Sequence, residues 1–192
     1  IYHGIDTNVY AYHNKPDEYV LYLGRITYEK GVHHAIAAAK AAGISIIIAG
    51  VSYTQEGYWS EYIEPHINGT TVQYVGQANL EKKLALLKHA KALLFPTLYD
   101  EAFGLVMIEA MSCGTPVIGF ASGAVPEVVQ DGESGFVVKN EKQMAEAIKK
   151  IQKISRETTR KRVENFFSIE RMTRGYEHVF ERAIARAKNN RQ

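Results

Sequence analysis

Short apolar segments alternate with helix-forming segments along most of the chain, and the first four of them stop at a glycine or a proline. The apolar segments cover residues 19–23, 44–49, 72–75, 92–95, 115–120 and 135–138. Helical patterns cover residues 30–42, 80–90 and 105–113, and two more helices begin near Asn140 and Ser168. Continuous apolar strands that alternate with helices are typical of a parallel sheet buried on both faces. We therefore predict an α/β fold: a Rossmann-like, doubly wound parallel sheet of about six strands with helices on both faces.

Ligands of such sheets bind beyond the carboxyl ends of the strands, so the segments that follow the strands are the places to search. The first is Gly24-Arg25-Ile26-Thr27-Tyr28-Glu29-Lys30-Gly31. Two cations flank this turn, and Lys30 is placed at the start of the predicted helix, where the helix dipole disfavours a cation. The pair is explained if an anion lies between them, with Arg25 gripping a phosphate and Lys30 supplying a point charge. The alternative is two ordinary surface cations.

A second candidate segment follows the fourth strand and carries two carboxylates, Glu101 and Glu109. Glu109 lies in an apolar helix, where a buried carboxylate needs a hydrogen-bonding partner, either a protein donor or a pair of ligand hydroxyls. Eight helical residues rise about 12 Å, which favours contact with two ends of a long ligand over a hydrolytic carboxylate pair. Gly104 opens this helix, whose first N–H groups can hold phosphate. Together the two segments describe a ligand with hydroxyls at both ends and a diphosphate between them, which is a nucleotide sugar.

The same segments resemble glycosyltransferase family 4, also called the group 1 glycosyltransferases. The resemblance rests on Gly24-Arg25 with Lys30-Gly31, and on the stretch from Glu101 to Met111. It continues through Cys113-Gly114-Thr115-Pro116-Val117-Ile118, Gly123-Ala124-Val125-Pro126-Glu127 and Asp131-Gly132 with Gly135. One difference is Ala102, where many family members carry proline or glycine before the phenylalanine.

The resemblance implies the GT-B architecture of two Rossmann-like domains, with this chain as the C-terminal, donor-binding domain. It also implies roles for individual residues. Arg25 and Lys30 would hold the diphosphate and stabilise the leaving group, and Glu101 would contact the donor sugar. Backbone amides around Ala102, Phe103, Gly104 and Leu105 would assist Glu101, and Gly24 would border the phosphates. Glu109 would accept from the ribose hydroxyls, and the base would lie against Val75, Gly76 and Gln77.

Such enzymes retain the anomeric configuration and generally need no metal or other cofactor, with a UDP-, GDP- or ADP-sugar as substrate. His33 and His34 are adjacent, which separates two side chains around a helix, so we expect no metal site there.

We divide the chain into an interdomain segment (1–15), the donor-binding domain (16–165) and a C-terminal helix (166–192). That helix would cross back to an N-terminal domain that this sequence lacks. A membrane surface and a second copy of the chain stay open as its other partners.

The charge distribution leaves the choice of partner open at the C-terminal end. Residues 149–192 carry 13 Lys/Arg against 5 Asp/Glu, although the whole chain has a net charge of only +2. No interleaved aromatic residues offer a base-stacking platform, so we expect no nucleic acid.

The chain has one cysteine, no secretory signal pattern and no apolar run approaching about 18 residues, from which we expect a cytoplasmic protein. It begins at Ile1 without a methionine and reads like the middle of a longer chain.

Two other functions stay open beside that of a retaining glycosyltransferase. The chain could be a nucleotide-sugar binding module without transferase activity of its own, which is the expected behaviour of an isolated donor domain. A GT-B enzyme of another kind, such as an epimerase or a phosphorylase, is the second alternative. A dinucleotide dehydrogenase is disfavoured because no G-x-G-x-x-G follows the first strand.

Overall fold

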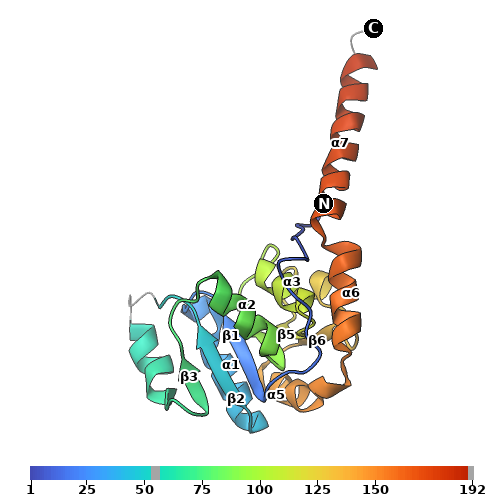
Figure 1. The fold of residues 1–192 in the computed structure, drawn as a ribbon. Helices are drawn as coiled ribbons and strands as arrows, with labels where there is room; N and C mark the ends of the chain where they lie inside the picture. The colour runs from blue at the N-terminus through green and yellow to red at the C-terminus, as the bar shows by residue number, and fades with distance from the viewer. Residues whose placement is uncertain (53–56, 190–192) are drawn as a thin grey trace.

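The computed structural model, which describes residues 1–52 and 57–189, confirms the predicted fold as a six-stranded parallel sheet with helices around it (Figure 1). The strand order is β3-β2-β1-β4-β5-β6. The strands are β1 (Tyr19–Leu23), β2 (Ser45–Ala49), β3 (Val72–Tyr74), β4 (Ala92–Phe95), β5 (Val117–Phe120) and β6 (Gly135–Val138). Because β1 lies between β2 and β4, the sheet reverses its winding direction beside β1, which is where doubly wound folds bind their ligands.

Helices cover both faces of the sheet, and each face has its own hydrophobic core. One core lies under α1 (Val32–Ala42) and α5 (Glu141–Lys150). The other lies under α2 (Leu80–His89), α3 (Leu105–Ser112) and α6 (Arg156–Phe166). Residues 92–95 and 117–120 of β4 and β5 are buried throughout. Two-sided burial explains why these strands are continuous apolar runs rather than alternating ones.

The turn after β1 differs from the expected helix start at Lys30. Residues Tyr28–Lys30 form a 3₁₀ turn, Gly31 follows in a left-handed conformation with φ of 69°, and α1 begins only at Val32. A side chain at position 31 would also collide with the carbonyl oxygen of Pro96. Both the left-handed backbone conformation and the lack of space therefore favour glycine there. Lys30 therefore precedes the helix, and the helix-dipole argument for an anion beside it does not apply.

Polar side chains define several helix ends. Asn79 and Asn140 cap α2 and α5 by accepting from backbone N–H groups of their first turns. Ser155 caps α6 in the same way, accepting from the Thr158 N–H. Helix α6 was not predicted from the sequence, since Thr159 and Val163 are its only buried residues and the hydrophobic pattern is correspondingly weak. A short helix, α4 (Val125–Val128), was also missed.

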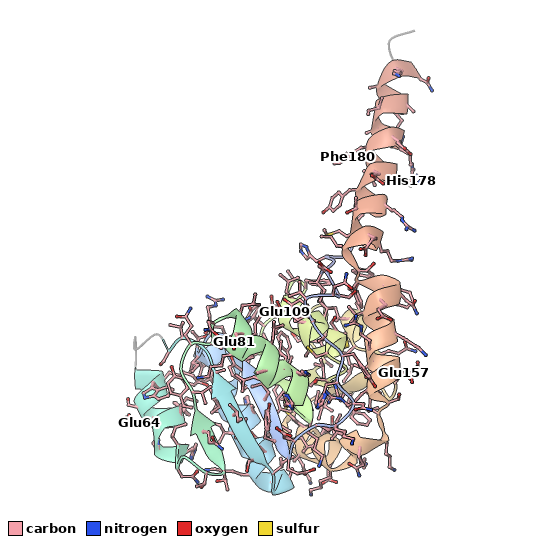
Figure 2. The ribbon with its side chains drawn as sticks, viewed as in Figure 1. Glu64, Glu81, Glu109, Glu157, His178 and Phe180 are labelled. Atoms are coloured by element: carbon pink, nitrogen blue, oxygen red, sulfur yellow. The ribbon has the colours of Figure 1, made fainter. Side chains whose placement is uncertain are left out.

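The longest helix, α7 (Ile169–Asn189), projects away from the rest of the domain (Figure 1). Along its length no residue is buried. Its apolar face is exposed, including Tyr176, Val179, Phe180 and Ile184, and Figure 2 shows Phe180 and His178 far from the sheet. The first residues of the chain lie at its base, where the Ile5 N–H donates to the Phe167 carbonyl at 3.0 Å. Among the described residues, no helix is both long and apolar enough to span a bilayer.

Candidate functional site: a charged cleft at the carboxyl edge of the sheet

A cleft of about 410 Å³ opens where β1 and β4 end and α3 begins. Most of the residues predicted for the donor site line it: Gly24, Arg25, Lys30, Glu101, Ala102, Phe103, Gly104 and Leu105. They come from two loops that meet because β1 and β4 are neighbours in the sheet, and Lys30 and Glu101, which join them, are 71 residues apart in sequence. The structure thus brings the two candidate segments together, whereas Val75, Gly76, Gln77 and Glu109 lie outside the lining of the cleft.

Lys30, Tyr99 and Glu101 form a hydrogen-bonded cluster at the cleft. The Lys30 ammonium contacts a Glu101 carboxylate oxygen at 2.5 Å, and the Tyr99 hydroxyl donates to the same oxygen at 2.8 Å. Lys30 also donates to the Tyr99 hydroxyl. Both charged side chains are largely buried, with exposed fractions of 14% for Lys30 and 19% for Glu101. Each of these two charges therefore depends on the other, because neither can be fully hydrated.

The pKa values of this pair move in the direction that keeps both groups charged. Burial alone would lower the pKa of Lys30, but its hydrogen bonds to Glu101 and Tyr99 outweigh burial and raise the pKa. Burial alone would raise the pKa of Glu101, but hydrogen bonds from Lys30 and Tyr99 outweigh it and lower the pKa. The positive charge of Arg25 lowers the pKa of Glu101 further. The cleft thus holds an ionised carboxylate and two cations at neutral pH.

Arg25 lies exposed at the rim of the cleft. The Tyr22 hydroxyl donates to the Arg25 carbonyl at 2.6 Å and fixes the backbone of the turn. The guanidinium is therefore held on a defined turn beside the cleft while its side chain faces solvent. A group of this kind can bind a phosphate bidentately.

The loop that carries Glu101 is held against a second loop, and α3 begins directly after it. The Ala124 N–H donates to the Glu101 carbonyl at 2.9 Å, and a side chain at Gly123 would collide with the Glu101 backbone. Gly104 precedes α3 with φ of 76°, and a Cβ there would lie 2.8 Å from the Met107 methyl carbon. Glycine at 104 lets the chain turn sharply into the helix, whose first N–H groups favour anions.

Glu109 forms a separate cluster, on α3 where it faces α2 (Figure 2). Its carboxylate oxygen Oε1 accepts from the Tyr10 hydroxyl at 2.7 Å and from the Lys83 ammonium at 2.7 Å. The exposed fractions are 14% for Glu109 and 24% for Lys83. The sequence left open whether Glu109 meets a protein donor or ligand hydroxyls. The structure shows protein donors on Oε1, and within residues 1–52 and 57–189 none contacts Oε2.

The segment predicted to face the base lies at the end of β3. The Gly50 N–H donates to the Gly76 carbonyl at 2.9 Å, which ties this segment to the end of β2. The Val75 carbonyl accepts from the Lys82 ammonium at 2.8 Å. Gly76 has φ of 71°, and apart from its chain neighbours no atom of the described residues lies within 4 Å of where its Cβ would be, so the space there is open.

Three side chains of these clusters were not predicted: Tyr10, Lys83 and Tyr99. Tyr99 could have been suspected, since it lies two residues before Glu101. Lys83 and Tyr10 are distant from Glu109 in sequence and belong to no motif, so no sequence pattern predicts their contact with it.

The two adjacent histidines do not separate around α1 as expected. The centroids of the His33 and His34 rings lie 4.1 Å apart. His33 Nδ1 is hydrogen-bonded with the Tyr58 hydroxyl at 2.8 Å, and His34 Nδ1 with the Glu141 carboxylate at 2.9 Å. Within residues 1–52 and 57–189, no group of three or more His, Cys, Asp or Glu side chains could hold a metal ion.

The fold and the cleft define a Rossmann-like domain that presents cations and helix N–H groups at the carboxyl edge of its sheet. The family profile "Glycosyl transferases group 1" matches residues 11–166, and the chain belongs to this family. It is 38% identical over 121 residues to a glycogen synthase of Mycobacterium tuberculosis, covering 60% of this chain and 29% of that protein.

Solved structures with the same fold include two named proteins. Sucrose-phosphate synthase from Thermosynechococcus elongatus is 26% identical with a TM-score of 0.81, covering 95% of this chain and 52% of that one. HepE of Anabaena, solved with UDP and glucose, is 20% identical with a TM-score of 0.79, covering 93% of this chain and 55% of that one. The chain therefore spans between about a third and about half of the length of these proteins.

Proposed function

We propose that this chain binds the nucleotide-sugar donor of a retaining family 4 glycosyltransferase and is the C-terminal domain of that enzyme. The observation that carries the proposal is the cleft itself, where Arg25, Lys30, Glu101 and the start of α3 meet. A diphosphate needs cations and N–H donors, and a sugar needs a carboxylate that accepts from its hydroxyls. Membership of the glycosyltransferase family supports the same ligand. The HepE structure, which holds UDP and glucose, supports it only through the shared fold.

Transfer breaks the bond between the anomeric carbon and the β-phosphate oxygen, and the electron pair stays on that oxygen. The acceptor hydroxyl forms the new bond and loses its proton, which leaves with the nucleoside diphosphate. Arg25 and Lys30 would stabilise the charge that develops on the leaving oxygen, which is the main electrostatic task in this reaction. Lys30 is well placed for it, because its pairing with Glu101 keeps it charged in a largely buried position.

The two carboxylates would bind the two ends of the donor. Glu101 lies in the cleft and would accept from the sugar hydroxyls, assisted by the backbone from Ala102 to Leu105. Glu109 would accept from the ribose hydroxyls through Oε2, with Tyr10 and Lys83 holding Oε1. Residues 75–77 would lie against the base, where the open space above Gly76 leaves room for a planar ring.

The parts of the chain outside this domain would connect it to the rest of the enzyme. Residues 1–15 would belong to the interdomain segment, and α7, which lies in the predicted C-terminal segment (166–192), would reach the N-terminal domain, which would supply the acceptor site. A cytoplasmic location goes with this proposal, because nucleotide sugars are made there. A donor-binding module that is inactive alone is the second candidate. It is favoured by the fact that the chain spans only part of its relatives.

The phosphate contacts can be tested with two variants and two ligands. Arg25→Ala and Lys30→Ala should each weaken binding of the nucleoside diphosphate by tenfold or more, which corresponds to about 1.4 kcal/mol. Binding of the bare nucleoside should change far less, because it lacks the groups that these cations contact. Isothermal titration calorimetry measures both ligands, and equal losses for the two would contradict the phosphate role.

A further inference from the structure

A cluster of aromatic rings lies next to the donor cleft and has no part in the proposed donor site. It consists of Tyr28 in the turn after β1, His33 on α1, and Tyr58 and Tyr62 at the π-helix η3 (Trp59–Ile63). Ring centroids lie 5.1 Å apart for Tyr28 and His33, which stack, and 5.6 Å apart for Tyr58 and Tyr62, which also stack. Tyr28 packs edge-on against Tyr58 at 5.9 Å. We call these four side chains the tyrosine platform.

Hydrogen bonds to neighbouring residues hold the tyrosine platform in place. The Tyr58 hydroxyl is hydrogen-bonded with His33 Nδ1 at 2.8 Å, and the Tyr58 side chain is buried. The turn that carries Tyr28 is fixed at both sides, by the left-handed Gly31 and by the Leu98 N–H, which donates to the Glu29 carbonyl at 2.8 Å. Rings that are ordered before a ligand arrives lose little conformational freedom on binding.

Two of the four rings, those of Tyr28 and Tyr62, are open to solvent. Tyr28 is 56% exposed and Tyr62 is 38% exposed. Of the exposed charged side chains next to them, Glu29 and Glu61 are acidic and Arg25, at the cleft end of the same turn, is basic, whereas Lys30 turns into the cleft toward Glu101. Burial lowers the pKa of His33 to about 4, so its ring adds no positive charge at neutral pH. The centroids of these two exposed rings lie 6.3 Å apart and the rings meet at 76°, so they form an angled surface rather than a flat one. Neighbouring exposed rings on a rigid base are a candidate binding surface.

We propose that the tyrosine platform binds a neutral oligosaccharide. The C–H face of a pyranose ring is apolar and flat enough to lie on a tyrosine ring, while its hydroxyls point outward. Tyrosine suits such a ligand, since it combines an apolar face with a polar tip. Glu29 and Glu61 can accept from the hydroxyls. Two acidic side chains beside Arg25 give this surface no excess of positive charge, which nucleic acid or an anionic membrane would need.

The position of the platform gives a bound saccharide a use. Tyr28 lies between Arg25 and Lys30 in one short turn, so a saccharide chain on the platform would run beside the donor cleft. The platform would then retain the acceptor or the growing product near the site of transfer. This use rests on the proposed glycosyltransferase function, whereas saccharide binding by the platform does not.

The test is calorimetric titration of the chain with maltoheptaose and with cellohexaose, in the absence of nucleotide. Tyr28→Ala and Tyr62→Ala should each weaken binding about fivefold or more, because each removes a stacking face. Tyr28→Phe should bind almost as well as the unchanged chain, since it keeps the ring. Tyr176→Ala is the matched control, because Tyr176 is 44% exposed on α7, away from the platform.

The outcomes separate this inference from the proposed function. Weakened saccharide binding in Tyr28→Ala and Tyr62→Ala, with unchanged nucleoside diphosphate binding, would support the platform. Absence of binding to both saccharides, or equal binding by the alanine variants and the unchanged chain, would overturn it. Nucleotide binding measured on the same samples tests the donor site independently, so either proposal can fail while the other stands.

Discussion

Replacing Lys83 with methionine should show whether Glu109 depends on its protein partners. Methionine keeps most of the volume of the lysine stem and removes the cation that lies 2.7 Å from Glu109 Oε1. Exposed ion pairs contribute about 0–1 kcal/mol, and breaking a fully buried pair costs about 3–5 kcal/mol. The Lys83–Glu109 pair lies between these limits, with exposed fractions of 24% and 14%. Since the Tyr10 hydroxyl would still donate, we expect a loss of about 2 kcal/mol in the free energy of unfolding.

Two comparisons make this measurement specific. Lys91→Met is the matched control: its ammonium contacts Glu18 at 2.5 Å, but Glu18 is 79% exposed. Urea titration measures the free energy of unfolding of both variants, and for Lys91→Met we expect a loss of less than about 1 kcal/mol. A double-mutant cycle of Lys83→Met with Glu109→Gln should give a coupling free energy of about 1–2 kcal/mol.

The cycle also has a functional counterpart. If Lys83 and Tyr10 orient Glu109 toward ribose, Lys83→Met should weaken the binding of a nucleoside diphosphate more than the binding of its 2′,3′-dideoxy form. Strictly additive unfolding free energies would refute the structural reasoning. Equal losses for the two ligands would refute the positioning of the carboxylate toward ribose, even if the stability effect is found.

Two further predictions concern stability. Gly31→Ala should lower the free energy of unfolding by more than about 2 kcal/mol, because it places a side chain in a left-handed conformation and against the Pro96 carbonyl; urea unfolding measures this, and a loss below 1 kcal/mol would refute the stated strain. Burial lowers the pKa of His33 to about 4, so the unfolded chain, with a histidine pKa of about 6.5, binds the proton more readily. Stability should therefore fall as the pH drops from about 6.5 toward 4, and His33→Gln should reduce the slope in this window; an unchanged slope would show that other groups cause it.

The sheet could be predicted from the sequence because two-sided burial leaves a strong trace. Residues 92–95 are apolar at every position, and the structure buries all of them. Helix α6 left almost no trace, because its contact with the core passes through Val163 and through arginines that bind backbone carbonyls, such as Arg160 to Tyr10 and Ser112.

The site divides in the same way. Arg25, Lys30 and Glu101 could be assigned to one edge of the sheet because their loops follow the carboxyl ends of predicted parallel strands. The contact of Glu109 with Lys83 and Tyr10 depends on how α2 and the N-terminal segment pack against α3, and no local pattern reports that packing. The error at Lys30 came from reading Gly31 as an ordinary helix residue, although it is the left-handed residue that ends the 3₁₀ turn.

Calorimetric titration of the chain with UDP, GDP and ADP, side by side, tests most directly whether the cleft holds the diphosphate of a nucleotide sugar. We predict that one of the three binds with one site per chain, and that Lys30→Ala abolishes or strongly weakens this binding. Such a result would also name the base. Absence of binding by all three, both to this chain and to a longer protein that contains it together with a preceding domain, would show that the cleft is not a diphosphate site.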